Sequence, residues 1–221
     1  MSQPTDILII RHGQTAWNQL KRLQGHSDIP LNEKGRLQAV TLAEILRDEP
    51  LDAIFSSDLQ RAYQTAHEIA RTHHLPVLTD KMFRERCYGA CEGMKDEEIR
   101  EAYPQSYAAW YAADPDHFFP DGERKTESPR QFHHRALNAI EHVASRYPGK
   151  RIAIVTHFGV IETAYRTACG IPLGKHCKMP VLNTSINRFR WHDGTLQLLQ
   201  WGEASHLEEA KKPPVDYYRH Y

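Results

Sequence analysis

The stretch Ile7-Leu8-Ile9-Ile10 runs directly into Arg11-His12-Gly13-Gln14-Thr15. Four consecutive apolar residues are typical of a short strand that is buried on both faces, as the strands of a parallel sheet are. The polar stretch that follows contains a glycine, and we predict a loop there. Ligands of such sheets bind just beyond the carboxyl ends of the strands, so this loop is the first candidate site.

The same pattern occurs again further along the chain. Ala53-Ile54-Phe55 is a second short apolar run, and Ile152-Ala153-Ile154-Val155 is a third, which ends at Thr156-His157. Segments with helical spacing of apolar residues alternate with these runs. This alternation predicts an α/β fold, a three-layer α/β/α arrangement around a mostly parallel central sheet. His12 and His157 both lie where a predicted strand ends, which marks them as candidates for chemistry.

Local signals predict where several elements begin and end. Asn32 is a candidate N-cap of a helix. We expect the apolar face of that helix to carry Leu37, Val40, Ala43 and Leu46. Ser57 and Gln60 match a capping box ahead of a second helix, and a long helix is predicted over residues 128–147. Near the end of the chain, His192-Asp193-Gly194-Thr195 predicts a β-hairpin with Asp-Gly at its turn.

The composition excludes several classes of protein. The 221 residues include 28 basic and 28 acidic side chains, so the chain lacks the basic excess of a nucleic-acid-binding protein. Its mean hydropathy is −0.64, and no apolar run is long enough to cross a membrane. The first residues do not resemble a signal peptide, and we expect a cytoplasmic protein. In that compartment the four cysteines should remain thiols: Cys87, Cys91, Cys169 and Cys177.

We expect one domain over residues 1–221 with an insertion at about 94–130. The insertion is polar and rich in aromatic residues, and we predict short helices and a loop that form a lid. Its aromatic residues are expected to form the core of that lid: Tyr103, Tyr107, Trp110, Tyr111, Phe118 and Phe119. The last dozen residues show no periodicity and are expected to form a loose tail.

Four blocks of sequence, taken in order, carry a more specific signal. The first block is Arg11-His12-Gly13-Gln14-Thr15, followed by Trp17-Asn18 and Arg22-Leu23-Gln24-Gly25. The second is Ser56-Ser57-Asp58-Leu59 with Arg61, and the third is Arg84-Glu85-Arg86 with Tyr88-Gly89. The fourth is Val155-Thr156-His157 with Gly159-Val160. Together they resemble the signatures of the histidine phosphatase superfamily, the phosphoglycerate mutase-like proteins, and most closely its phosphatase branch. One Arg-His-Gly triplet would be weak evidence, whereas four ordered blocks are strong evidence.

The resemblance implies a metal-independent phosphatase that needs no cofactor and hydrolyses a small phosphorylated metabolite. His12 would be the nucleophile that becomes phosphohistidine, and Glu85 would be the proton donor and later the base. Guanidinium groups suit phosphate, and a protonated or hydrogen-bond-donating His157 would stabilise the transferring oxygens. The implied phosphate-binding residues are Arg11, Asn18, Gln24, Arg61 and His157.

Other residues are assigned lesser roles. Glu92 is also typical of the family, and we interpret it as structural. Phe158 stands where the family usually has glycine, so its side chain is expected to shape the phosphate pocket. Arg124 and Lys125 are candidates for binding a second anionic group of the substrate. The other 12 of the 14 histidines are expected to be surface residues, with no metal site among them.

Two alternatives remain open at this point. A cofactor-dependent phosphoglycerate mutase would use the same nucleophile, but it would need added cations in the insertion, and residues 95–116 contain only Lys95 and Arg100. A non-catalytic phosphate-binding scaffold would have lost at least one of the five catalytic candidates, which are all present. The oligomeric state, monomer or homodimer, does not follow from the sequence.

Overall fold

The computed structural model describes residues 3–207, which fold around a six-stranded sheet. In chain order the strands are β1 (Thr5–Arg11), β2 (Ala53–Ser56), β3 (Val77–Thr79), β4 (Arg151–Thr156), β5 (Ile186–His192) and β6 (Thr195–Glu203). Their order in space is β3-β2-β4-β1-β5-β6. The first four strands pair in parallel, and β5 and β6 are added antiparallel. The predicted mostly parallel sheet is confirmed.

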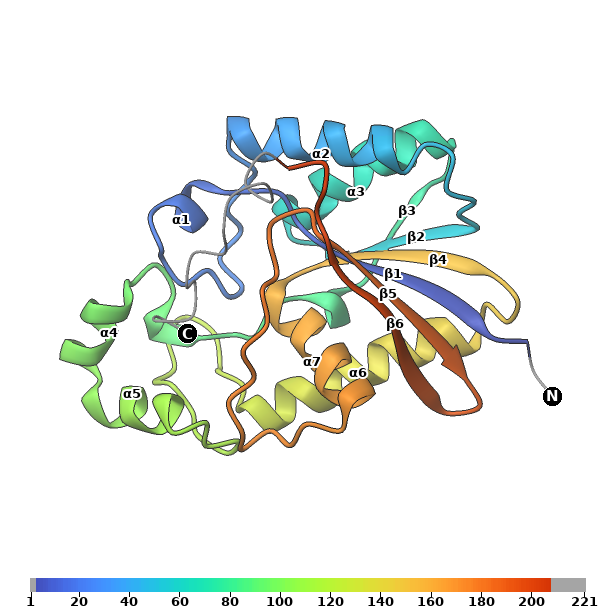
Figure 1. Cartoon of the computed structure of the whole chain (residues 1–221). Helices are drawn as coiled ribbons and strands as arrows, with labels where there is room; N and C mark the ends of the chain where they lie inside the picture. The colour runs from blue at the N-terminus through green and yellow to red at the C-terminus, as the bar shows by residue number, and fades with distance from the viewer. Residues whose placement is uncertain (1–2, 208–221) are drawn as a thin grey trace.

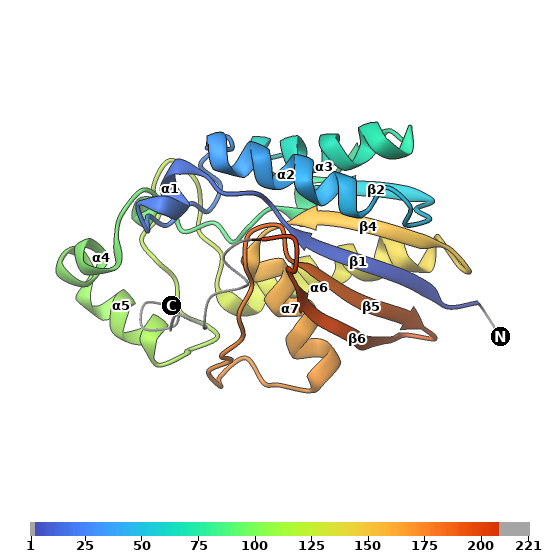
Figure 2. The same cartoon turned by 45° about the horizontal axis from the view of Figure 1, so that its top comes forward.

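Helices cover both faces of this sheet. Within the described residues they are α1 (Ala16–Gln19), α2 (Glu33–Ile45), α3 (Gln60–His73), α4 (Asp96–Ala102), α5 (Pro104–Tyr111), α6 (Pro129–Ser145) and α7 (Phe158–Cys169). Figure 1 shows α2 and α3 on one face of the sheet and α6 and α7 on the other. The turned view in Figure 2 shows the same two layers. The three-layer α/β/α arrangement predicted from the sequence is therefore confirmed.

The first strand explains why both layers are needed. Its residues alternate between the two faces, and each face is apolar. Ile7 and Ile9 pack in one core cluster with α6 and α7, whereas Leu8 and Ile10 pack in a second cluster with α2 and α3. A strand that is apolar on both sides is stable only between two layers of helices.

The position of β4 decides where the functional residues meet. This strand comes after β1, β2 and β3 in the chain, but it lies between β1 and β2 in the sheet. Its register pairs Arg11 with Thr156, the last residues of β1 and β4. The backbone N–H of His12 then donates to the carbonyl of Thr156 at 2.9 Å. His12 and His157, far apart in the chain, are therefore neighbours at one edge of the sheet.

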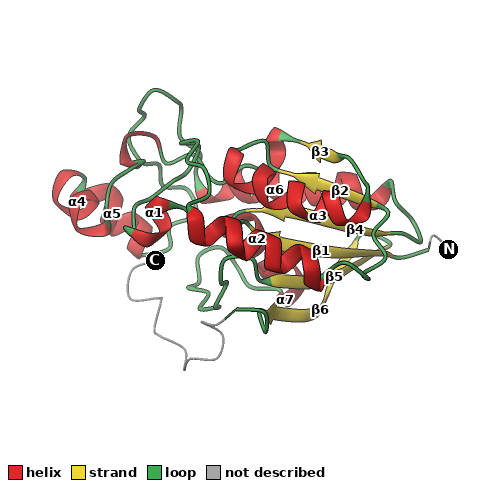
Figure 3. Cartoon of the chain, turned by 90° about the horizontal axis from the view of Figure 1, so that it is seen from above, coloured by secondary structure: helices red, strands yellow, loops and turns green. Residues whose placement is uncertain are grey.

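The predicted insertion contains α4 and α5 and lies at the end of the molecule where the parallel strands end, beside α1 (Figure 3). It has a small core of its own, built on Cys91, Ile99 and Phe119. Partly buried side chains surround that core: Leu23, Tyr88, Met94, Tyr103, Tyr107 and Trp110. Tyr111 and Phe118 are exceptions to the prediction, because both are exposed.

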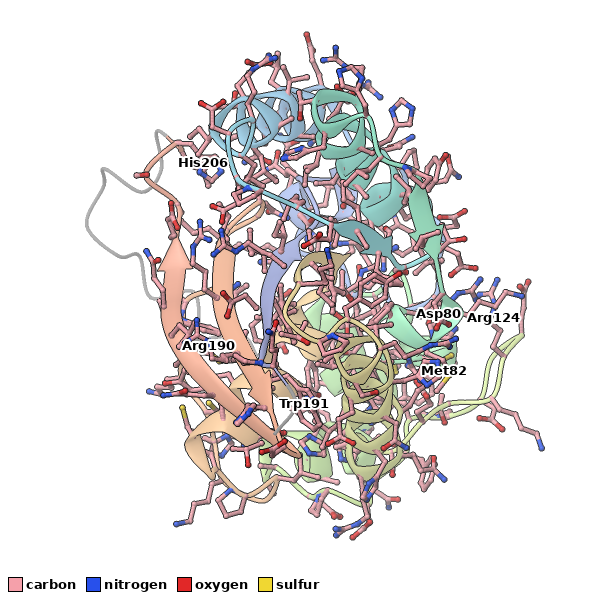
Figure 4. The ribbon with its side chains drawn as sticks, turned by 90° about the vertical axis from the view of Figure 1, so that its right-hand side faces the viewer. Asp80, Met82, Arg124, Arg190, Trp191 and His206 are labelled. Atoms are coloured by element: carbon pink, nitrogen blue, oxygen red, sulfur yellow. The ribbon has the colours of Figure 1, made fainter. Side chains whose placement is uncertain are left out.

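The predicted hairpin is present as β5 and β6. Asp193 and Gly194 both have positive φ angles, 47° and 79°, as a two-residue turn between twisted strands requires. In β5, Arg190 forms an ion pair with Asp6, whereas the next residue, Trp191, packs on the core below α6 and α7. Figure 4 labels these two neighbours. The predicted tail, residues 210–221, lies outside the described residues.

Two local predictions were wrong. On α2, Leu37 is 64% exposed and Val40 is also exposed, while Leu42 and Gln38 are buried. Gln38 is held inward because its side-chain oxygen accepts a hydrogen bond from the backbone N–H of Gln14 at 2.9 Å. The buried residues of this helix and its C-cap are Gly35, Gln38, Ala39, Leu42, Ala43 and Leu46.

The capping box of Ser57 and Gln60 is absent. Leu59 is the N-cap of α3 and contributes no side-chain hydrogen bond. The first helical N–H, that of Gln60, instead donates to the carboxylate of Asp28 at 2.7 Å. The cap thus comes from a distant loop, which a local pattern cannot reveal. The short edge strand β3 was not predicted either.

Within residues 3–207 no helix combines the length and the apolar character of a membrane span. The four cysteines in this part of the chain form no disulfide.

The corrected orientation of α2 gives a matched pair of substitutions. Leu42→Ala should lower the free energy of unfolding by about 3 kcal/mol, because it leaves a cavity in a closed core. Leu37→Ala should change it by less than about 0.5 kcal/mol, because that side chain faces solvent. Urea unfolding followed by circular dichroism measures both values. Equal losses from the two substitutions would contradict this packing.

Candidate active site

Each of the four parallel strands delivers one candidate residue to the same edge of the sheet. His12 follows β1, His157 follows β4, Arg61 lies in the first turn of α3 beyond β2, and Glu85 comes after β3 and the short 3₁₀ helix Lys81–Phe83. All four side chains are buried. The carboxyl ends of the strands thus gather the residues that the sequence blocks singled out.

His12 is held as a neutral ring with one free nitrogen. Its Nδ1 lies 2.7 Å from the carbonyl oxygen of Gly13, and since a carbonyl can only accept, Nδ1 carries the proton. Its Nε2 makes no hydrogen bond with any residue between 3 and 207, so the lone pair there is open. Burial and the charges of Arg61 and Arg11 hold the pKa of His12 well below 6.5. A neutral imidazole with an exposed lone pair is what a nucleophile requires.

His157 has the opposite tautomer. The Nε–H of Arg61 donates to His157 Nδ1 at 3.2 Å, so the proton of the ring is on Nε2. That buried Nε2–H has no hydrogen-bond acceptor among the described residues. Burial and the charge of Arg61 hold the pKa of His157 well below 6.5. Of the two forms considered from the sequence, protonated or donating, the structure therefore supports the neutral, donating ring. The rings of His12 and His157 lie 5.2 Å apart, centre to centre.

Arg61 is fully buried and is held by three neighbours. Besides His157, its NH1 and NH2 groups donate to the carbonyls of Ser27 and Gly25 at 2.8 and 2.7 Å. It forms no ion pair with a carboxylate among the described residues. Burial lowers its pKa to about 10, so it keeps its charge at neutral pH. A buried cation without a carboxylate partner suits an anionic ligand.

Arg11 and Phe158 lie against each other. The NH1 group of Arg11 donates to the carbonyl of Val181 at 2.5 Å, and its guanidinium carbon lies 5.9 Å from the centre of the Phe158 ring. Phe158 also packs on the core between the sheet and α7. The side chain that replaces the usual glycine thus supports an arginine of the site from one side.

Asn18 and Gln24 are positioned through Thr15. The side-chain oxygen of Asn18 accepts from the backbone N–H of Thr15 at 3.1 Å. The Thr15 hydroxyl, which has one proton to donate, lies 3.1 Å from that oxygen and 3.0 Å from the side-chain oxygen of Gln24. These contacts place both amides around the Thr15 hydroxyl. Contact of either side chain with phosphate stays a prediction.

Glu85 packs against the start of α7. Its two oxygens accept from the backbone N–H groups of Arg86 at 2.9 Å and Gly159 at 3.2 Å. A Cβ atom at Gly159 would lie 2.4 Å from the Glu85 carboxylate, so only glycine allows this approach. The carboxyl group of Glu85 is therefore fixed at the N-terminal end of α7, where it contacts the residue two positions beyond His157.

Glu92 has a different environment. Its carboxylate accepts from the backbone N–H groups of His26 and Tyr88 at 2.9 and 3.2 Å and from the hydroxyl of Ser27 at 2.7 Å. These bonds tie the loop that contacts Arg61 to the segment before the insertion. The geometry agrees with a structural role for Glu92.

Sequence reasoning missed Arg86 and its neighbour His117. Arg86 is only 5% exposed and, like Arg61, forms no ion pair with a carboxylate among the described residues. Its Nε–H donates to the carbonyl of Glu127 at 2.8 Å, and its NH2 group lies 3.2 Å from His117 Nε2. The rings of Tyr88 and Phe119 lie 5.4 Å from its guanidinium carbon.

These contacts leave the NH1 group of Arg86 without a hydrogen-bond partner in residues 3–207. The signal in the sequence was Arg86 itself, directly after Glu85. Nothing in the sequence indicated that this arginine would be buried. His117 is buried too, which contradicts the expectation that the remaining histidines lie on the surface.

Arg124 and Lys125 lie on the outer part of the insertion. Both are exposed, and Arg124 comes within 3.9 Å of the Glu92 carboxylate. Figure 4 shows Arg124 on a loop at the periphery of the molecule. Their proposed contact with a second anionic group stays a prediction. In the described part of the chain, no three His, Cys, Asp or Glu side chains gather as a metal site would.

This geometry agrees with comparisons to known proteins. The model of the histidine phosphatase superfamily (branch 1) matches residues 7–204. The chain is 39% identical to "Phosphoglycerate mutase-like protein 4" of Arabidopsis thaliana over 93% of this chain and 88% of that protein. It is 36% identical to the "Metal-independent phosphoserine phosphatase" of the same plant, over 95% and 86%. Among solved structures, the phosphoserine phosphatase of Entamoeba histolytica in complex with 3-phosphoglyceric acid has a TM-score of 0.80 and 26% identity, and the match covers 91% of this chain and 98% of that one.

The buried neutral histidines make stability depend on pH. Below about pH 6.5 the unfolded chain binds protons at these residues while the folded chain, whose pKa values are held low, does not. Stability should therefore fall as the pH is lowered from 6.5. His12→Asn should reduce this slope by about 1 kcal/mol per pH unit between pH 6 and 5. Urea unfolding at several pH values measures how the free energy of unfolding changes with pH. As a control, the wild-type protein and the variant should show the same slope near pH 8. An unchanged slope below pH 6 would mean that His12 is protonated in the folded protein.

Proposed function

The chain belongs to the histidine phosphatase superfamily (branch 1), and from that membership we propose that it hydrolyses a small phosphomonoester through a covalent phosphohistidine on His12. Relatives that cover nearly the whole chain carry the name of phosphoserine phosphatase. They favour hydrolysis over the transfer of a phosphoryl group between two substrates.

The observation that carries this proposal is the opposite tautomers of the two buried histidines. His12 presents a lone pair on Nε2, while His157, 5.2 Å away, presents an N–H donor on the corresponding nitrogen. Phosphoryl transfer needs both groups at one place, a nucleophile for phosphorus and a donor for its oxygens. The buried charge of Arg61 adds a cation that forms no ion pair with a carboxylate in the described part of the chain.

In the proposed first step the lone pair of His12 Nε2 forms a bond to phosphorus, and the bond from phosphorus to the ester oxygen breaks. Arg11, Arg61 and the Nε2–H of His157 hold the other three oxygens, where negative charge is spread in the transition state. Glu85, protonated at this stage, gives its proton to the leaving alcohol.

In the second step Glu85 acts as the base. Its carboxylate takes a proton from a water molecule, whose oxygen forms a bond to phosphorus as the bond to His12 breaks. Inorganic phosphate leaves, and both side chains return to their first states. No cofactor takes part in these steps, and the proposal assigns them all to side chains of this chain.

Arg86 supports a substrate with a carboxylate on its alcohol part. This buried guanidinium follows Glu85 directly, and Glu85 faces the leaving oxygen in the proposed reaction. A carboxylate two or three bonds from that oxygen would pair with the unbonded NH1 group. Phosphorylated hydroxy acids and amino acids meet this requirement. 3-Phosphoglyceric acid, held by the Entamoeba histolytica relative, is one such compound.

The reaction can be tested with p-nitrophenyl phosphate, 3-phosphoglycerate and phosphoserine in the presence of a chelator. We expect turnover that survives the chelator and falls at least about 10³-fold in His12→Ala. Acid-labile, base-stable phosphate on the wild-type chain, absent from the variant, would identify the phosphohistidine. Activity that requires an added metal would overturn the mechanism. Interconversion of phosphoglycerates without release of phosphate would support a mutase instead.

The role of Arg86 gives a separate prediction. Arg86→Gln should lower the ratio of kcat/KM for 3-phosphoglycerate to that for p-nitrophenyl phosphate by about 10-fold to 100-fold, because a charged hydrogen bond is lost. Arg100→Gln, on the exposed side of α4, is the matched control and should keep the wild-type ratio. If this ratio of kcat/KM values is unchanged in Arg86→Gln, another residue must bind the carboxylate of the substrate.

A further inference from the structure

The segment that carries Glu85 has no regular secondary structure of its own. Residues 85–88 lie between two 3₁₀ helices, Lys81–Phe83 and Gly89–Cys91, and belong to no helix or strand. A ladder of backbone hydrogen bonds therefore does not fix Glu85. A proton donor has to be held to within about 0.5 Å of its working position, so other contacts must supply that precision.

Arg135, on α6, supplies most of these contacts. Its NH1 group donates to the carbonyls of Met82 and Arg84 at 2.8 and 3.0 Å, and its NH2 group donates to the carbonyl of Glu85 at 3.1 Å. Its Nε–H and the second proton of NH2 bind the two carboxylate oxygens of Glu127 at 2.6 and 2.7 Å. These bonds use all five N–H donors of the guanidinium. None remains for a substrate, so Arg135 can affect the reaction only through the residues that it holds.

Glu127 extends the same clamp to the residues that follow. One of its carboxylate oxygens also accepts from the backbone N–H of Cys87 at 3.2 Å, and its carbonyl accepts from the Nε–H of Arg86 at 2.8 Å. Glu127 itself lies just before α6. Its ion pair with Arg135 therefore spans residues 82–87 and attaches this segment to the first turns of α6.

The guanidinium of Arg135 is mostly buried and is fixed from a further side. Its carbon atom lies 5.0 Å from the centre of the Phe132 ring, which is one turn earlier on α6. That ring lies close to Gly159, whose backbone N–H binds the Glu85 carboxylate. Glu85 is thus held by α6 through its backbone and by α7 through its carboxylate.

We infer that Arg135, together with Glu127, is a positioning residue that holds Glu85 where it gives its proton to the leaving oxygen. This inference rests on the proposed phosphatase function. His26 assists from another loop, since its Nε2–H donates to the same Glu85 carbonyl at 2.9 Å. Loss of the Arg135 fork should displace the acid, while His12 stays in place because the sheet fixes it.

Two aryl phosphates that differ in their need for a proton donor test this inference. Phenol is a poorer leaving group than p-nitrophenol, so hydrolysis of phenyl phosphate depends more on the acid than hydrolysis of p-nitrophenyl phosphate does. Neither compound carries a carboxylate, so binding by Arg86 does not enter the comparison. Values of kcat/KM include steps only up to release of the phenol, so the later role of Glu85 as a base does not affect their ratio.

Arg135→Gln should lower the ratio of kcat/KM for phenyl phosphate to that for p-nitrophenyl phosphate by about tenfold. Glu85→Gln should lower this ratio at least as much. The double variant should show the ratio of Glu85→Gln alone, because both residues act on one proton transfer. Arg135→Lys, which keeps the charge but loses the planar fork, should show part of the fall.

Arg151→Gln is the matched control. Arg151 also forms ion pairs, with Glu49 and Asp6, but it lies at the first residue of β4, the opposite end of that strand from His157. Its loss should lower stability and leave the ratio at the wild-type value. Because each ratio is measured on one preparation, partial unfolding of a variant does not alter it.

The possible results separate this inference from the proposed function. If the wild-type protein hydrolyses neither aryl phosphate, the proposed function fails. If Glu85→Gln leaves the ratio unchanged, Glu85 is not the acid and the role of Arg135 falls with it. If Glu85→Gln lowers the ratio but Arg135→Gln does not, or if the two effects multiply in the double variant, only the positioning role of Arg135 is overturned.

Discussion

The parallel pairing of β1 with β4 is the contact on which the rest of the site depends. It brings His12 and His157 side by side, although 144 residues separate them, and it fixes the register through the bond from His12 N–H to Thr156. Apolar side chains on both faces of β1 require a layer of helices on each side. Those layers in turn place the first turn of α3, with Arg61, and the start of α7 around the same edge. The burial of the strand and the chemistry at its end thus have a common cause.

The electrostatics of the site follow from what is buried there. Arg61 and Arg86 are buried and form no ion pair with a carboxylate among residues 3–207, while the two histidines beside Arg61 remain neutral. Such an arrangement is costly in a folded chain unless an anion enters it. A phosphomonoester with a carboxylate supplies negative charge at both points. The neutral overall composition of the protein therefore gives no sign of these two buried arginines.

The sequence allowed every strand but β3, the layers and the main candidate residues to be predicted, because those depend on local apolar runs and on motifs that end at them. His12 and His157 could be found since each directly follows a strand. The failures have long-range causes. On α2 the polar Gln38 is buried with a hydrogen bond from Gln14, and the cap of α3 comes from Asp28. The burial of Arg86 depends on how the insertion folds over it, with Phe119 and His117 arriving from more than 30 residues away. No pattern along the chain encodes such contacts.

The insertion around α4 and α5 has a small hydrophobic core that is separate from the two cores of the sheet. Substitutions within this core should therefore shift the residues that the insertion covers, such as Tyr88 and Arg86. They should shift the strands that carry the histidines much less. A fold built in this way can change its substrate without risking its reaction. Evolution can vary the insertion as a unit, and an engineer can exchange it between relatives, while the phosphoryl-transfer groups keep their places.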